Sequence, residues 1–293
     1  MEKKILYRPS GGSLSSLTSI AISPKGRLIA CGTMDGQILL VDSKSGKSKR
    51  NITGHEGGVA AVSFAGKPSS IVSCSRDRTT RLWNTKSKDD PVVLKHSSEV
   101  KALTISIPSR KGASGARDGE VKVFSLSSLK CIKNLQAHRS DISGILFIED
   151  DKKMVTSSYN GECRVWDLST YELIETLTKK GPRIRSLTST PDGSFVFLGR
   201  HGGTILKISM ENIKDKIEML GHSDIVSTMS VNHTGKFLAS GSWDRTLRIW
   251  SLDDFKEVTS GKLVTGIASL AWSSKEDTIF SADFSGSIVS WSL

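Results

Sequence analysis

Two sets of histidine, serine and aspartate residues in this sequence have the side-chain types of a hydrolytic triad. They share one spacing and consist of His55, Ser73 or Ser75 and Asp77, and of His222, Ser240 or Ser242 and Asp244. In a hydrolase these side chains would act as base, nucleophile and orienting acid. An active site needs such a set once, whereas recurrence at a constant spacing indicates a structural role. We therefore predict that the protein is not an enzyme.

The same periodicity argues against metal and cofactor sites. Four of the six histidines occupy one repeat position, so they cannot surround a single metal ion: His55, His96, His138 and His222. Gly202-Gly203 lacks the strand and helix context of a phosphate-binding loop. No Cys-x-x-Cys motif occurs, and we expect four buried free thiols at Cys31, Cys74, Cys131 and Cys163. We predict no metal, no cofactor and no small-molecule substrate.

The repeat that carries these residues recurs every 41 or 42 residues along the sequence. Its turn position holds Asp35, Asp77, Asp118, Asn160, Gly202, Asp244 and Ser285. Six residues further on, every copy has an apolar residue: Val41, Trp83, Phe124, Trp166, Ile208, Trp250 and Trp291. The histidine position lies 22 residues before the turn position. Self-similarity at a fixed period of this length identifies a repeat architecture.

Each unit has the pattern of four short strands and no helical periodicity. Segments such as "VAAVSF" and "ISGILF" alternate with the period of two that is typical of half-buried strands. Turn sequences such as "SPKG" and "NHTG" follow, then a second strand, the tight turn and a third strand such as "TLRIW". A fourth strand leads to the next unit. The sequence therefore predicts an all-β protein.

These features resemble the WD-repeat (beta-transducin repeat) family over essentially the whole chain. The Gly-His of that family is present at Gly54-His55 and Gly221-His222, and its Trp-Asp pair is intact only at Trp166-Asp167. The resemblance implies a seven-bladed β-propeller of four-stranded antiparallel blades. We expect one domain over residues 1–293, with repeats that begin near residues 13, 55, 96, 138, 180, 222 and 263.

The two ends of the chain are expected to close the ring. The last repeat stops at "VSWSL", after its third strand, and "KKILYR" (residues 3 to 8) precedes the first repeat. We predict that residues 3 to 8 form the outer strand of the seventh blade, which leaves no unpaired gap between blades and protects the strand edges.

The resemblance also implies a buried hydrogen-bonded network of His, Ser or Thr, Asp and Trp in each well-formed blade. The complete sets contain His55, Asp77 and Trp83 in repeat two, and His222, Asp244 and Trp250 in repeat six. Repeat five replaces the polar residues with Lys180, Gly202 and Ile208. Because a buried imidazole or indole N–H needs partners, we expect blades two and six to be the best formed and blade five the weakest.

In this family the tight turns lie on the face around the central channel, which commonly binds partners. The residues before the turn position are large, and none is acidic: Met34, Arg76, Arg117, Tyr159, His201, Trp243 and Phe284. The positions three and five residues after the histidine position add Lys101, Arg183, Arg185 and Ile225, diluted by Glu99 and Asp141. We predict a buried Trp250 and an exposed Trp243 that anchors a partner beside an arc of arginines. The alternative is that these turn residues vary freely and have no function.

The net charge of +11 suits acidic partners or nucleic acid. We interpret the third-strand cations Arg81, Lys122, Arg164 and Arg248 as solvated blade faces. The favoured function is a non-enzymatic scaffold that binds a peptide or protein segment, with acidic or phosphorylated groups facing the arginines. The alternative is an RNA- or ribosome-associated protein that uses the same face. Since we find no membrane-spanning stretch and no signal peptide, we expect an intracellular protein, in the cytoplasm or the nucleus.

Overall fold

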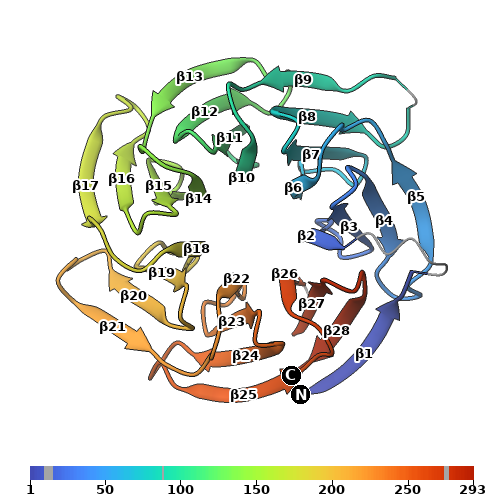
Figure 1. The fold of residues 1–293 in the computed structure, drawn as a ribbon. Coiled ribbons are helices and arrows are strands. Elements are labelled where there is room, and N and C mark those ends of the chain that lie inside the picture. The colour runs from blue at the N-terminus through green and yellow to red at the C-terminus, as the bar shows by residue number, and fades with distance from the viewer. Residues whose placement is uncertain (10–15, 88, 274–276) are drawn as a thin grey trace.

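The computed structural model describes residues 1–9, 16–87, 89–273 and 277–293, which form seven four-stranded antiparallel sheets arranged as blades in a ring (Figure 1). The predicted seven-bladed propeller is thus confirmed, although the start of the first repeat near residue 13 lies outside the described residues. We number the blades by their repeats.

In blades one to six the strands follow one another in chain order from the centre of the ring outward (Figure 1). Blades one to three contain β2 (Leu17–Ile22), β3 (Leu28–Thr33), β4 (Ile38–Asp42) and β5 (Ser48–Ile52); β6 (Val59–Phe64), β7 (Ser70–Ser75), β8 (Thr79–Asn84) and β9 (Val92–Lys95); and β10 (Val100–Ser106), β11 (Lys111–Ala116), β12 (Glu120–Ser125) and β13 (Cys131–Gln136). Blades four to six contain β14 (Ile142–Ile148), β15 (Lys153–Ser158), β16 (Cys163–Asp167) and β17 (Leu173–Thr178); β18 (Ile184–Ser189), β19 (Phe195–Arg200), β20 (Ile205–Ser209) and β21 (Lys216–Met219); and β22 (Val226–Val231), β23 (Phe237–Ser242), β24 (Thr246–Ser251) and β25 (Glu257–Lys262).

Blade seven is completed by the N-terminal strand, as predicted. Its sheet order is β1 (Glu2–Tyr7), β28 (Ile288–Ser292), β27 (Thr278–Asp283) and β26 (Ile267–Trp272). The two chain ends meet at this blade in Figure 1. β1 pairs antiparallel with β28, with Ile5 opposite Val289. Leu6 and Tyr7 also pack against a core shared by blades one and seven, so β1 ties both blades together.

The hydrophobic core lies between neighbouring blades. Leu40 of blade one, for example, packs in one cluster with Val62 and Trp83 of blade two. The second strands are buried on both faces, whereas outer strands such as β13 are mostly exposed. Consequently Cys131 on β13 is exposed and the prediction of a buried thiol is wrong there, while the other three cysteines are buried.

One irregularity recurs in the innermost strand of every blade. Its pairing with the second strand skips one residue, which forms a β-bulge at Thr18, Ala60, Lys101, Ser143, Arg185, Ser227 and Ala268. A bulge inserts an unpaired residue and redirects its side chain. These seven residues are those five positions after the histidine position.

Candidate functional site

In blade two the four side chains expected to form a network bond one another in a chain. Trp83 Nε1 donates to Ser73 Oγ (2.7 Å), Ser73 Oγ donates to His55 Nε2 (2.7 Å), and His55 Nδ1 donates to Asp77 Oδ2 (2.6 Å). This pattern requires a neutral imidazole protonated on Nδ1. Burial lowers the pKa of His55, against the opposing effect of Asp77. Ser75 instead donates to the Gly57 carbonyl oxygen, at 2.8 Å.

Blade six repeats this arrangement, and the imidazoles of both networks are buried. The three bonds that join Trp250, Ser240, His222 and Asp244 are each 2.8 Å long. The His55 and His222 side chains have no exposed surface. A base that is already fully bonded and shielded from solvent cannot meet a substrate, so the geometry is that of a structural network rather than a triad.

Blades three and four build a related network from a different acid. His96 and His138 bond through Nδ1 to Glu120 (3.0 Å) and Glu162 (3.1 Å), which lie two residues beyond the turn position. In blade four, Trp166 and His138 share Thr156 Oγ1, each at 2.8 Å. Blade four therefore also holds a network of four side chains, with Thr156 and Glu162 in place of the serine and aspartate of blades two and six. Glutamate has one methylene more than aspartate, and from two residues beyond the turn position its carboxylate still reaches the histidine Nδ1.

The third-strand cations are part of the scaffold, so their interpretation as solvated blade faces is wrong. Three of them donate to the backbone carbonyl that precedes the histidine position: Arg81 to Gly54 (2.7 Å), Lys122 to Lys95 (2.8 Å) and Arg164 to Ala137 (2.7 Å). Arg248 pairs with Glu257. Four positive charges are thus committed within the blades.

A cavity of about 780 Å³ opens near the ring axis, on the side of the tight turns. Seven of the ten residues predicted to contact a partner line it: Met34, Arg76, Lys101, Tyr159, Arg185, Trp243 and Phe284. Six of the seven bulge residues line it as well, since the bulge turns their side chains toward the axis. Arg117, Arg183 and His201 do not line it, nor does Ile225. We call this space the channel-mouth cavity.

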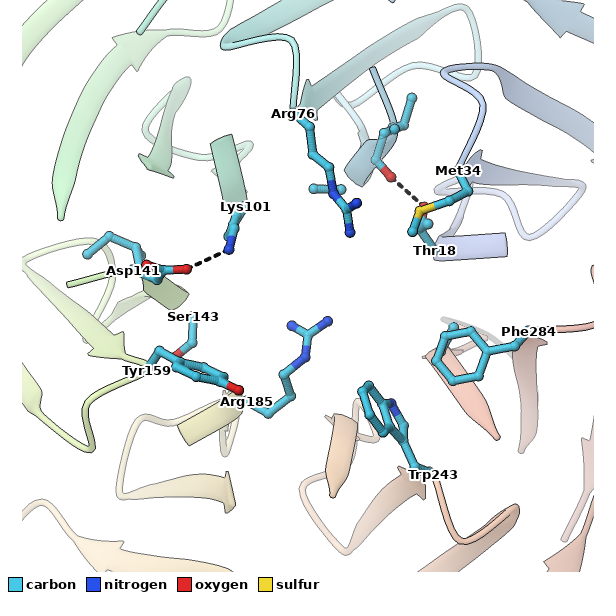
Figure 2. Close-up of a pocket in the computed structure, with 15 residues that line it drawn as sticks. Thr18, Met34, Arg76, Lys101, Asp141, Ser143, Tyr159, Arg185, Trp243 and Phe284 are labelled. Atoms are coloured by element: carbon cyan, nitrogen blue, oxygen red, sulfur yellow. Dashed lines mark hydrogen bonds and ion pairs between the residues drawn. The ribbon is translucent and has the colours of Figure 1, made fainter. Parts of the chain in front are cut away.

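One side of the channel-mouth cavity is apolar. Trp243 and Phe284 are 42% and 39% exposed, and their rings meet edge to face with centroids 5.8 Å apart (Figure 2). Gly266 lies beneath them, and a Cβ there would be 3.1 Å from both the Phe284 ring and Trp243 Cα. Trp250, in contrast, is 2% exposed. The two tryptophans therefore differ in exposure as predicted.

The other walls of the cavity carry three cations, Arg76, Lys101 and Arg185, and one of them is already paired. Lys101 Nζ lies 2.5 Å from Asp141 Oδ2. Outside the cavity, Arg117 pairs with Glu99 at 3.2 Å. Arg76 and Arg185 point toward the middle of the cavity and toward each other (Figure 2). Among the described residues, no carboxylate forms an ion pair with either guanidinium.

Tyr159 joins these cationic walls to the residues outside the cavity. The Arg183 guanidinium lies over the Tyr159 ring, 5.2 Å from its centroid, and the His201 ring meets it edge to face at 5.0 Å. Burial and the charges of Arg183 and Arg185 lower the pKa of His201. Arg183 and His201 therefore pack against the Tyr159 ring without lining the cavity themselves.

Neither a candidate metal-binding group nor a helix that could span a membrane occurs in the described part of the chain. It contains no group of three or more His, Cys, Asp or Glu side chains that could hold a metal ion. Within the same residues, no helix is long and apolar enough to cross a membrane.

Comparison with known proteins identifies the repeat. The model of the WD domain, G-beta repeat (WD40) matches residues 5–42, 46–84, 129–167 and 214–251. The guanine nucleotide-binding protein subunit beta of Oryza sativa subsp. japonica is 23% identical over 270 residues, which cover 81% of this chain and 70% of that protein. Nuclear distribution protein PAC1 of Arthroderma otae is 26% identical over 273 residues, which cover 80% of this chain and 50% of that protein.

Protein tipD of Dictyostelium discoideum is 24% identical over 297 residues, which cover 96% of this chain and 47% of tipD. These relatives carry different names at similar identities, so they do not single out a subfamily. The family model, however, covers more than half of the sequence. The chain therefore belongs to the WD40 repeat family, whose propellers generally serve as non-enzymatic scaffolds for protein interactions.

Proposed function

We propose that this propeller is a scaffold that binds a peptide or protein segment across the channel-mouth cavity. The observation that carries the proposal is the pair of exposed rings, Trp243 and Phe284, which shares one cavity with the guanidinium groups of Arg76 and Arg185. Neither guanidinium forms an ion pair with a carboxylate in the described part of the chain. Aromatic and arginine side chains in such a setting are the residues most enriched at binding hot spots. Met34 and Tyr159 extend the contact surface on either side.

RNA or ribosome association is less well supported by the same geometry. The third-strand cations bond carbonyl groups or carboxylates of the blades, and Lys101 and Arg117 are paired with acids. The net charge therefore overstates the number of cations on this face that are open to a phosphate backbone.

The proposal is tested by comparing what the protein and two variants capture from extracts of its own cells. The Trp243→Ala/Phe284→Ala variant removes the aromatic pair. Leu220→Ala is the matched control, because Leu220 is 69% exposed and does not line the cavity. We expect defined proteins to be lost with the double variant and retained with the control, both variants being folded by circular dichroism. Identical captures would refute the proposal, and captures abolished by ribonuclease would favour the RNA alternative.

A further inference from the structure

We propose that Arg76 and Arg185 form a clamp for a phosphorylated side chain of the bound peptide, with a neighbouring apolar side chain seated on Trp243 and Phe284. This inference rests on the proposed function, since it names the chemistry of the segment bound there.

The two clamp arginines come from opposite parts of the ring. Arg76 follows β7 in blade two, at the tight turn, and Arg185 is the bulge residue of β18 in blade five. Figure 2 shows their guanidinium groups reaching inward from facing walls. Like charges held this way repel each other, and an anion placed between them removes the repulsion. The Arg185 side chain is exposed within the cavity, yet desolvation by the surrounding channel walls lowers its pKa, and the charge of Arg76 adds to the effect.

Charge balance separates these two arginines from the other cations of the face. Lys101 is neutralised by Asp141, Arg117 by Glu99, and Arg183 lies on the Tyr159 ring. The cavity lining as a whole carries three cations and one carboxylate, a surplus of two positive charges. A phosphate monoester carries about −1.5 to −2 charges at pH 7 and so complements that surplus.

The opposed positions of the two guanidinium groups favour a phosphoryl group over a carboxylate. A carboxylate is planar and satisfies one arginine fork along one edge. A phosphoryl group has three terminal oxygens in a tetrahedral arrangement, so it can accept from two forks that approach from different sides. Glutamate in place of the phosphorylated residue should therefore bind less well.

The apolar side of the cavity specifies the neighbouring residue of the peptide. The Trp243–Phe284 pair stands over Gly266, and the bulge residue of the same blade seven, Ala268, is a small residue that lines the cavity. This leaves room for a large aliphatic or aromatic side chain beside the clamp. A soluble phosphorylated ligand without such a group would use the arginines and not the aromatic pair.

The test uses immobilised peptide libraries that have phosphoserine, serine or glutamate at a fixed central position and degenerate flanks. They are exposed to the protein and to Arg76→Met, Arg185→Met and Arg117→Met. Arg117 is the matched control, because it occupies the repeat position of Arg76 on the same face but is paired outside the cavity. Thermal melts establish that each variant is folded.

We expect retention of the phosphoserine library, with large apolar residues selected next to the phosphoserine. Arg76→Met and Arg185→Met should each weaken the selected phosphopeptide about tenfold, as expected for the loss of a charged hydrogen-bonding partner, and Arg117→Met less than about twofold. Trp243→Ala should weaken phosphorylated and unphosphorylated peptides alike.

The other outcomes separate the clamp from the proposed function. Equal retention of the serine and phosphoserine libraries in a Trp243-dependent manner would overturn the clamp and leave the peptide scaffold standing. An equal loss with Arg117→Met would reduce the clamp to a general charge effect. Retention of no library would refute both proposals. Inositol hexakisphosphate that binds through Arg76 and Arg185 but not Trp243, with no phosphopeptide retained, would overturn the peptide as the source of the phosphoryl group.

Discussion

At the scale of single residues, Trp243 and Trp250 lie seven positions apart and have different roles in the structure. Trp250 is buried and donates to Ser240, so Trp250→Ala should lower the free energy of unfolding by about 3–5 kcal/mol. Trp243→Ala loses only the edge-to-face contact with Phe284 and should cost about 1 kcal/mol. Urea denaturation of the two variants measures both values. Similar losses would contradict this division of roles.

The sequence predicted the residues whose position the repeat itself determines. Trp243 precedes a tight turn and Trp250 lies in a third strand, so the period alone places both. It did not predict the bulge at Arg185, because one inserted residue leaves the alternation of a short strand nearly unchanged. Nor did it predict the Lys101–Asp141 pair, whose partners lie 40 residues apart and meet only when adjacent blades pack.

The glutamates of blades three and four were missed for a similar reason. Glu120 and Glu162 lie at a position where blades two and six have threonine, and their use as histidine partners depends on side-chain reach rather than on spacing. The histidine partners that the sequence did predict are Asp77 and Asp244, because both their residue type and their repeat position match the family. Whether blade five is the weakest blade remains a prediction.

At the scale of elements, β1 is the strand on which ring closure depends. It pairs along β28, and Leu6 and Tyr7 pack against the core between blades one and seven. Deleting residues 1–8 should expose the β28 edge and uncover that core, so the protein should melt at a much lower temperature or aggregate. Scanning calorimetry and light scattering measure both effects.

Ile5→Ala is the control for this deletion. Ile5 lies in the middle of β1, but its side chain is 47% exposed, so its truncation leaves the strand pairing intact. We expect a change in unfolding free energy within about 0.5 kcal/mol, as for an ordinary surface substitution. A truncated protein that stays monomeric and melts with the full-length chain would show that closure does not depend on β1.

At the scale of the whole molecule, the network imidazoles are distributed over four of the seven blades and share one environment. Burial lowers the pKa of His55, His138 and His222, and it lowers the pKa of His96 to about 4. The ring is therefore assembled with neutral imidazoles, each of which donates from Nδ1 to an acid of its own blade. Protonation of any one of them would give Nε2 a proton where Ser or Thr now donates.

This common environment determines how stability depends on pH. The unfolded chain binds protons on these imidazoles near pH 6.5, whereas the folded chain binds them only at lower pH, so unfolding takes up protons. The free energy of unfolding should therefore fall as the pH decreases from about 6.5 toward 4.

The acids act in the same direction at lower pH. Burial alone would raise the pKa of Asp244, but hydrogen bonds from Thr246, Ser223 and His222 outweigh it and lower the pKa to about 2. Urea denaturation at pH 7.5, 6 and 5 should show a progressive loss of stability, and His96→Gln should reduce the dependence on pH below that of the parent protein. A free energy of unfolding that is constant or rises between pH 7.5 and 5 would show that the imidazoles are not held neutral by the fold.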